Sequence, residues 1–234
     1  MARPAHIPRQ TQAMQSGRII LLNGSSSAGK TTLARAIQLI RPEPWFHLAL
    51  DQFRDGMPPA YRGLNSPPGT PGARGLNVVP ETRDGRPLTH IEFGDVGRAM
   101  LHGMHRAIAA FSDAGNNVIV DDLILDTGTL SDYLHTLRDH WVLFVAVRAP
   151  LEVVNAREAE RAGRFPGTAT SHFERVHAHG EYDLEVDTSE QTPEQCAYQV
   201  TALLETAQQP RAFARLRSLQ GTADADVPDA FGRP

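Results

Sequence analysis

The sequence predicts an α/β fold in which helices cover both faces of a parallel β-sheet. Two observations predict it. Five short apolar runs alternate with segments of helical periodicity, and strands separated by helices form right-handed βαβ units in one parallel sheet. The chain has 234 residues, of which 41% are hydrophobic and 21% charged, as in an ordinary soluble domain with a full core. The expected strands comprise residues 19–22, 45–50, 118–120, 141–147 and 184–186.

The first strand leads into a glycine-rich segment that is typical of phosphate binding. Residues 24–31 fit the pattern G-x-x-x-x-G-K-[ST], and helical periodicity follows over residues 32–40. In such a unit, backbone N–H groups and the helix N-terminus point at phosphate oxygens. We therefore expect a nucleoside triphosphate, with Lys30 on its β- and γ-phosphates and the Thr31 hydroxyl on Mg²⁺. The expected nucleotide-binding residues are Gly24, Ser25, Ser26, Ser27, Ala28, Gly29, Lys30, Thr31 and Thr32.

Three further helices are predicted from their apolar spacing. The first covers residues 96–111 and ends near Gly115, and the second covers residues 130–137. The third begins with an N-cap threonine, a proline at the first helical position and a capping-box glutamine in residues 192–195. Its apolar face includes Cys196, which we interpret as a small buried hydrophobic residue.

The two ends of the chain differ from its middle. We expect residues 1–17 to be a flexible N-terminal extension, because they lack the apolar segment of a secretory signal; a transit peptide is the alternative. One domain is expected over residues 18–209. Residues 210–234 are rich in Gly, Ala, Asp and Pro, so we expect a largely disordered tail.

Residues 58–92 interrupt the alternation of strands and helices. This segment carries seven prolines, and a long connection of that kind is usually functional or disordered. Asp84-Gly85, flanked by residues 78–79 and 88–91, favours a small β-hairpin. Two interpretations follow: an insert that lies over an acceptor site, or a mobile surface loop.

Composition argues against several other classes of protein. A net charge of −4 gives no electrostatic reason to bind nucleic acid or an anionic membrane, and apolar runs such as residues 141–147 are too short to span a bilayer. The single cysteine excludes an internal disulfide and fits a reducing cytoplasm. His177 and His179, with His172 upstream, do not predict a zinc site, because residues two apart on a helix point in different directions.

Carboxylates follow two of the predicted strands, at the sheet edge where ligands of α/β proteins gather. Asp51 follows the second strand, and Asp121 and Asp122 follow the third. An aspartate beside a transferred phosphoryl group orients an acceptor hydroxyl and takes its proton, which is the role that we expect for Asp51. An aspartate after the middle strand holds Mg²⁺, which is the role that we expect for Asp121. Either could instead cap the next helix.

Three arginines follow the fourth strand at spacings of four and three residues. Arg157, Arg161 and Arg164 would share one helical face and neutralise charge on a γ-phosphate, with residues 163–170 as the hinge of a lid. The alternative is a solvated face of Arg–Glu pairs, because glutamates lie between the arginines.

Taken together, these motifs resemble those of the chloramphenicol phosphotransferase family of small P-loop kinases. The resemblance runs from about Ile19 to about Leu204. It rests on residues 22–31, Pro42-Glu43-Pro44-Trp45, Leu50-Asp51 with Met57-Pro58, Val120-Asp121-Asp122, Arg157-Glu158 with Arg161 and Arg164, Val176-His177, and residues 181–188.

The resemblance implies a fold and an activity. The fold is a five-stranded parallel sheet of the nucleotide-kinase type, and the activity is transfer of the ATP γ-phosphoryl group to a primary hydroxyl of chloramphenicol. The aspartate matching Asp51 serves there as the base, and the arginines matching Arg157 and Arg161 contact phosphates. Residues 187–189 would lie near the adenine.

We therefore expect a cytoplasmic, Mg²⁺-dependent ATP phosphotransferase whose acceptor is chloramphenicol or a similar molecule, with a role in antibiotic resistance. Two alternatives stay open. The acceptor could be a sugar, a nucleotide-sugar or another antibiotic, because the 58–92 insert is longer than the family's usual segment; or the chain could be a nucleotide-dependent switch. GTP is not excluded as the donor, and the oligomeric state is open.

Overall fold

The computed structural model describes residues 15–225 apart from 162, 164, 207 and 208. Most of the expected N-terminal extension, residues 1–17, therefore lies outside the described residues. Gly17 is already part of the fold, because its amide donates a 2.8 Å hydrogen bond to the carbonyl of Ser112.

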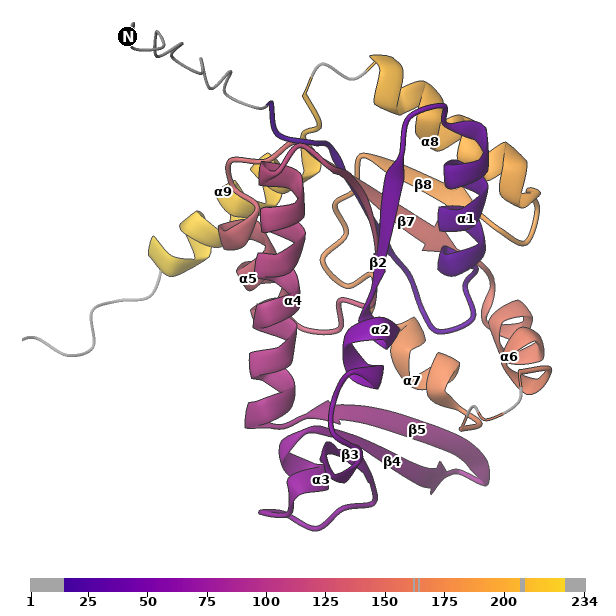
Figure 1. Ribbon diagram of the computed structural model, residues 1–234. Helices are drawn as coiled ribbons and strands as arrows, with labels where there is room; N and C mark the ends of the chain where they lie inside the picture. Colours follow the sequence, from indigo (N-terminus) through magenta and orange to yellow (C-terminus); the bar gives the residue numbers. More distant parts are fainter. Residues whose placement is uncertain (1–14, 162, 164, 207–208, 226–234) are drawn as a thin grey trace, which may run out of the picture.

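The main sheet has five parallel strands, which confirms the predicted fold class. The strands are β1 (Ile19–Asn23), β2 (Trp45–Ala49), β6 (Asn117–Asp122), β7 (Val142–Arg148) and β8 (Leu184–Asp187), in the order β2-β6-β1-β7-β8. The first strand lies in the middle, paired with β6 and β7 (Figure 1). The loops after these central strands therefore meet at one edge of the sheet, where ligands bind in open α/β sheets.

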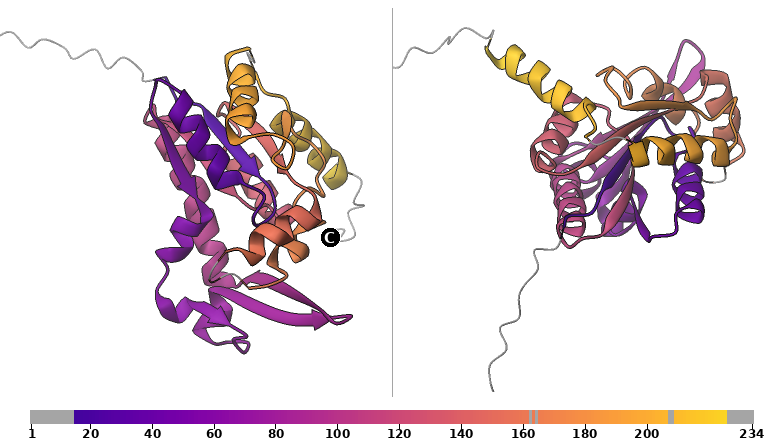
Figure 2. Two further views of the ribbon diagram at one scale, coloured as in Figure 1. Left: turned by 90° about the vertical axis from the view of Figure 1, so that its right-hand side faces the viewer. Right: turned by 90° about the horizontal axis from the view of Figure 1, so that it is seen from above.

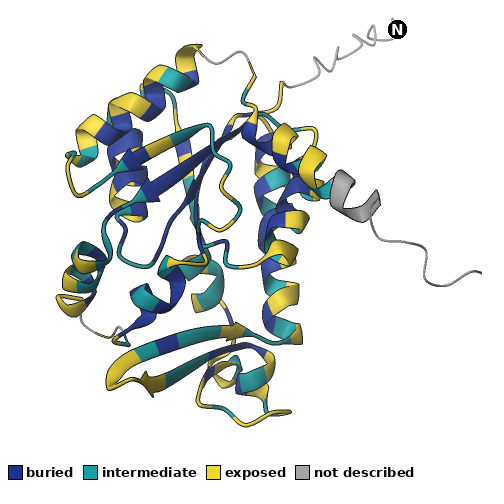
Figure 3. Cartoon of the chain, turned by 180° about the vertical axis from the view of Figure 1, so that it is seen from behind, coloured by how far each residue is buried: buried dark blue, intermediate teal, exposed yellow. Residues whose placement is uncertain are grey.

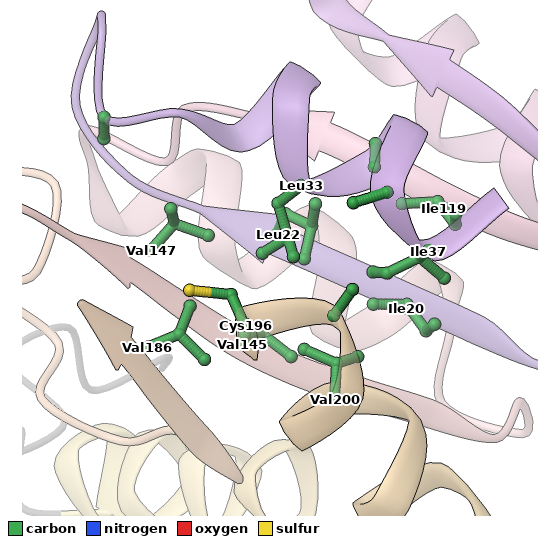
Figure 4. Close-up of a cluster of buried hydrophobic side chains, with 14 of the residues drawn as sticks. Ile20, Leu22, Leu33, Ile37, Ile119, Val145, Val147, Val186, Cys196 and Val200 are labelled. Carbon is green, nitrogen blue, oxygen red and sulfur yellow. The ribbon is translucent and has the colours of Figure 1, made fainter. Parts of the chain in front are cut away.

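Helices cover both faces of this sheet. α1 (Lys30–Ile40) and α8 (Pro193–Thr206) cover one face, and α4 (Asp95–Asp113), α5 (Thr127–Thr136) and α9 (Ala212–Ala225) cover the other (Figures 1 and 2). Each face of the sheet has its own hydrophobic core: the first lies under α1 and α8, and the second under α4, α5 and α9. Because side chains alternate along a strand, Ile20 and Leu22 enter the first core and Ile19 and Leu21 enter the second. Figure 4 shows the first core, in which Leu33 and Val200 pack against Leu22 and its neighbours. The sheet is buried and the outer helix faces are exposed (Figure 3).

The 58–92 insert forms a second, smaller sheet after α2 (Leu50–Asp55). It comprises the 3₁₀ turn η1 (Pro59–Tyr61), β3 (Arg62–Leu64), α3 (Pro71–Arg74), β4 (Leu76–Arg83) and β5 (Arg86–Phe93). β4 and β5 pair antiparallel through the predicted Asp84-Gly85 turn, whose residues have φ values of 50° and 74°. Two positive φ values are typical of the two-residue turn whose twist matches that of a hairpin. The insert is therefore largely regular structure.

The C-terminal prediction is wrong over part of its length. Residues 210–234 were expected to be largely disordered, but Ala212–Ala225 forms α9, and residues 226–234 lie outside the described residues. The Asp183 carboxylate accepts hydrogen bonds from the amides of Arg211 and Ala212, at 2.7 and 2.9 Å, which satisfies the start of the helix. Phe213 is buried against Phe144, so apolar contacts hold a segment that its composition does not distinguish from a disordered one.

Two short helices complete the fold. α6 (Leu151–Ala159) follows β7, and α7 (Thr168–Phe173) lies between the main sheet and β5 (Figure 1). Among the residues described, none of the helices has the length and apolar character needed to cross a membrane.

Candidate active site

The glycine-rich loop, residues 24–29, joins the end of β1 to the start of α1. Gly29 precedes α1 with φ at 97°, a conformation that glycine adopts without the penalty other residues incur. The Lys30 ammonium lies back inside the loop and donates to the carbonyls of Gly24 and Ser25, at 2.8 and 3.0 Å. The ammonium can exchange these two hydrogen bonds to carbonyls for hydrogen bonds to phosphate oxygens.

One polar atom of the loop is buried without a partner. The Ser27 hydroxyl oxygen has no hydrogen-bond partner among the described residues. Leaving a buried polar group unpaired costs roughly 1–3 kcal/mol, so the loop is built to receive a polar ligand. A phosphate oxygen fits this requirement.

The loop lines a cleft of about 1170 Å³. The expected nucleotide-binding residues that reach the cleft are Ser26, Ser27, Gly29, Lys30, Thr31 and Thr32. Gly24, Ser25 and Ala28 lie behind its surface, and their carbonyls accept hydrogen bonds from the side chains of Lys30 and Thr188.

The two predicted magnesium ligands, Thr31 and Asp121, lie side by side at the end of β6. The Thr31 hydroxyl donates a 2.6 Å hydrogen bond to Asp121, and Lys30 lies 3.8 Å from the same carboxylate. Burial alone would raise the pKa of the Asp121 carboxyl, but the charge of Lys30 and the polar neighbours His47 and Thr31 outweigh it, and the pKa is lowered. A hydroxyl and an ionised carboxylate side by side are ligands that Mg²⁺ prefers.

Asp122 has a different environment from its neighbour. Asp122 is 1% exposed and contacts Tyr133, a residue of the core under α4, α5 and α9. Its carboxylate accepts hydrogen bonds from the Tyr133 hydroxyl and the Leu123 amide, at 2.6 and 2.7 Å. Burial raises the pKa of the Asp122 carboxyl. Asp122 therefore lies at the cleft lining but is almost fully enclosed, and its carboxylate is bonded to Tyr133 and to the backbone.

Asp51 stands in the first turn of α2 and lines the same cleft. Its side chain is 50% exposed, and one carboxylate oxygen pairs with Arg54 at 2.7 Å. The Gln52 side chain, not Asp51, accepts the amide hydrogen of Ala49 at the start of α2. Asp51 thus lies at the cleft and is paired with Arg54, and its role as a base stays a prediction.

Arg157 connects the cleft to the loop after β8. Its guanidinium donates to the hydroxyl and the carbonyl of Thr188, at 2.9 and 2.7 Å. The Thr188 hydroxyl in turn donates to the carbonyl of Ala28 at 2.8 Å. The arginine therefore lies against the glycine-rich loop.

The expectation that three arginines share one helical face is wrong. α6 ends at Ala159, so Arg161 lies beyond the helix, exposed at the cleft wall, and Arg164 lies outside the described residues. Beyond the end of α6, the Glu158 carboxylate accepts hydrogen bonds from the amides of Gly167 and Ala169, and Gly163 adopts a φ of 77°. A hinge over residues 163–170 stays a prediction.

The insert supplies the wall opposite the glycine-rich loop. The residues that face the cleft from it are Arg62, Gly63, Leu64, Leu76, Val78, Ile91 and Phe93. Most are apolar, and two arginines, Arg54 and Arg62, lie at this side. The insert thus faces the cleft, and acceptor binding there stays a prediction.

The histidines near residue 180 belong to a partly buried hydrogen-bond network. The Tyr182 hydroxyl contacts Asn23, His177 and His179 at 2.7, 2.7 and 3.1 Å, and Asn23 also bonds the carbonyl of Val176. Burial lowers the pKa of both histidines to about 4 and raises the pKa of Tyr182. Because Asn23 ends β1, this network anchors the start of the loop. Within the described part of the chain, no group of three or more His, Cys, Asp or Glu residues is arranged to hold a metal ion.

Among the cleft residues that the sequence analysis did not single out, His47 lies nearest to the Asp121 carboxylate. His47 lies in the middle of β2, with Nε2 at 3.7 Å from the Asp121 carboxylate and without a hydrogen-bond partner among the described residues. The available signal was a single polar residue in an otherwise apolar strand, on the same side of the strand as Ala49 near its end.

Comparison with known sequences gives a clear match. The profile of the family described as chloramphenicol phosphotransferase-like protein matches residues 17–205. Two proteins of Mycobacterium tuberculosis, from strains CDC 1551 and H37Rv, are each 35% identical over 209 residues, which span 87% of this chain and 89% of theirs; both are named as inferred O-phosphotransferases.

Comparison with solved structures shows the fold. A sugar kinase from Janibacter sp. HTCC2649 is 21% identical over 82% of this chain and 96% of its own, with a TM-score of 0.55. The Mycobacterium tuberculosis APS kinase in complex with AMPPNP and APS is 18% identical over 82% and 99%, with a TM-score of 0.56. The tunicamycin resistance protein of Deinococcus radiodurans is 21% identical over 80% and 95%, with a TM-score of 0.54.

Proposed function

Since the chain belongs to the chloramphenicol phosphotransferase-like family and is a P-loop kinase, we propose that it transfers the γ-phosphoryl group of ATP to a hydroxyl of chloramphenicol or a similar acceptor. One observation carries the proposal. A single cleft is lined by the glycine-rich loop, by Asp121 and Asp51, and by the largely apolar wall of the insert. Donor groups and a candidate base therefore face the same space as an acceptor wall. We propose that the reaction takes place in the cytoplasm and gives antibiotic resistance.

The donor half of the cleft would hold MgATP. Lys30 exchanges the carbonyls of the loop for the β- and γ-phosphates, and the loop amides and the Ser27 hydroxyl hold the remaining oxygens. Thr31 and Asp121 would hold Mg²⁺, which when bound neutralises charge on the phosphates.

The acceptor half would carry out the proton transfer. The acceptor hydroxyl oxygen forms a bond to the γ-phosphorus, the bond from that phosphorus to the bridging oxygen of ADP breaks, and Asp51 takes the hydroxyl proton. Arg157 and Arg161 lie at the cleft and would neutralise charge on the transferred group. The apolar residues Leu64, Val78 and Phe93 favour an acceptor with an apolar body over a sugar.

The test is ADP release from MgATP in the presence of chloramphenicol and of a panel of other hydroxylated antibiotics and sugars. Stimulation by chloramphenicol, with a product heavier by about 80 Da for the added HPO₃, supports the full proposal. Stimulation by another compound keeps the kinase and replaces its acceptor. Slow ATP hydrolysis that no hydroxyl compound changes would contradict the acceptor proposal and favour a nucleotide switch.

Replacing Asp51 isolates the base. Asp51→Asn keeps the size of the side chain but removes its basicity, so kcat should fall by roughly 10²–10⁴ with little change in the KM for ATP. Asp55→Asn is the matched control, because Asp55 lies on the same helix and pairs with the same Arg54. If Asp51→Asn abolished ATP binding, its role would be structural or metal-related instead.

A further inference from the structure

Glu158 is a buried carboxylate next to Arg157, and the proposed chemistry gives it no task. Its side chain does not lie on the solvated face of Arg–Glu pairs that the sequence offered as an alternative, because the residue is 5% exposed. Its two carboxylate oxygens accept hydrogen bonds from the amides of Gly167 and Ala169, at 2.9 and 2.8 Å. Charge-assisted bonds of this kind are among the stronger ones in proteins, so they fix the start of α7 to the end of α6.

The segment that Glu158 holds is bonded in turn to the hairpin wall of the cleft. Thr89, in the middle of β5 and 1% exposed, donates its amide hydrogen to the Gly167 carbonyl at 3.2 Å and its hydroxyl to the Pro166 carbonyl at 2.8 Å. The Thr89 carbonyl accepts a hydrogen bond from the Ser171 hydroxyl. Gly167 has a φ of 83°, and a Cβ there would lie 2.3 Å from a carbonyl oxygen of β5, so the contact needs glycine.

Arg157, the neighbour of Glu158 in the chain, is linked to the glycine-rich loop. Arg157 is bonded to Thr188, and Thr188 to the carbonyl of Ala28. Hydrogen bonds therefore link the loop to Arg157 and link Glu158 to the start of α7 and β5, and the two sets are joined by the backbone of α6, in which Arg157 and Glu158 are neighbours. Two sites are coupled when both contact one structural element and each shifts the equilibrium between its conformations. The end of α6 and the start of α7 contact both the glycine-rich loop, through Thr188, and β5, so they can be that element.

We propose that Glu158 is a positioning residue that couples the glycine-rich loop to the β4–β5 hairpin. Nucleotide bound at the loop restricts the motion of Arg157 and of the adjacent Glu158. Through its bonds to the start of α7, Glu158 then restricts the motion of Thr89 and the hairpin. The wall of the acceptor half therefore becomes ordered before the acceptor enters. The inference rests on the proposed nucleotide binding at the loop, and it does not depend on which acceptor is used.

Amide hydrogen exchange with MgAMPPNP as the probe tests the coupling without an acceptor. In the unmodified protein, the probe should slow exchange in residues 24–31 and, by about tenfold or more, in residues 86–93. The Thr89 amide is the direct reporter, because it donates across the junction. Protection of the loop without any protection of the hairpin overturns this inference alone. Absence of protection at the loop overturns the proposed function and this inference with it.

Glu158→Gln is the decisive variant, because it keeps the shape but leaves one acceptor oxygen and no charge. Loop protection should remain, while the effect of the probe on residues 86–93 should fall to within about twofold of none. Glu152→Gln makes the same change at an exposed position of the same helix and should behave as the unmodified protein. A merely structural role would speed hairpin exchange with and without the probe and leave their ratio unchanged, which overturns the proposal.

Thr89→Val tests the other end of the junction and keeps the side-chain shape. It removes the hydroxyl bond to the Pro166 carbonyl and should also reduce the effect of the probe on residues 86–93. If Glu158→Gln fails to fold, this variant alone decides, and an unchanged hairpin response then overturns the proposal.

Discussion

Two adjacent aspartates at the end of β6 have different environments because their side chains lie on opposite faces of the strand. Asp121 faces the cleft beside Lys30, whereas Asp122 is enclosed with Tyr133. Asp122→Asn should lower the free energy of unfolding by about 1–3 kcal/mol, because it weakens buried hydrogen bonds, and should leave the KM for ATP nearly unchanged. Asp121→Asn should lower turnover at least about a hundredfold, because it removes the negative charge of a candidate ligand of Mg²⁺.

Urea unfolding and initial rates of ADP release measure the two effects. Each variant is the matched control of the other, because both make the same chemical change one residue apart. A large loss of turnover in Asp122→Asn at unchanged stability would reverse the assignment.

At the scale of elements, α9 is the helix that the amino-acid composition of its segment did not predict. Phe213 is 5% exposed and meets Phe144 edge-on, with ring centroids 5.4 Å apart. Phe213→Ala should lower the free energy of unfolding by about 3 kcal/mol through lost burial and the cavity left behind. Leu219→Ala, at a position 57% exposed on the same helix, should cost less than about 0.5 kcal/mol in the same urea titration. Equal effects would mean that α9 does not pack on the sheet in solution.

The same helix shows what the sequence could and could not predict. The five strands, the glycine-rich loop and the Asp84-Gly85 turn were predictable because their signals are local: apolar runs, a fixed motif and a dipeptide suited to positive φ. α9 depends on Asp183 and Phe144, which lie far from it in the sequence. The end of α6 at Ala159 was missed because the spacing of the arginines does not show where the helix ends.

In the candidate site, sequence order predicted which residues could share the cleft but not their contacts. Asp51 and Asp121 follow neighbouring parallel strands, so their common edge could be predicted from the topology. The nearness of His47 to Asp121 and the bond between Arg157 and Thr188 are tertiary contacts across elements, and one sequence carries no local signal for them.

At the scale of the whole molecule, the network around Tyr182 links the stability of the fold to pH. Burial lowers the pKa of His177 and His179 to about 4, whereas unfolding returns each to an ordinary value near 6.5. Between these values the unfolded chain binds protons that the folded chain does not. The contribution of the pair is therefore complete above about pH 6.5 and is lost progressively as the pH falls toward 4.

Urea midpoints measured from pH 7 down to about pH 4.5 should accordingly fall with acidity. Other groups also titrate in this window, so the decisive comparison is the slope of the His177→Gln/His179→Gln double variant. That variant has no imidazole at either position to protonate, and its midpoint should depend less steeply on pH, whatever its stability at pH 7. Because Asn23 joins this network to the end of β1, acid unfolding should expose the glycine-rich loop together with the sheet. An unchanged slope would show that the two histidines keep ordinary pKa values and that their burial does not couple the fold to pH.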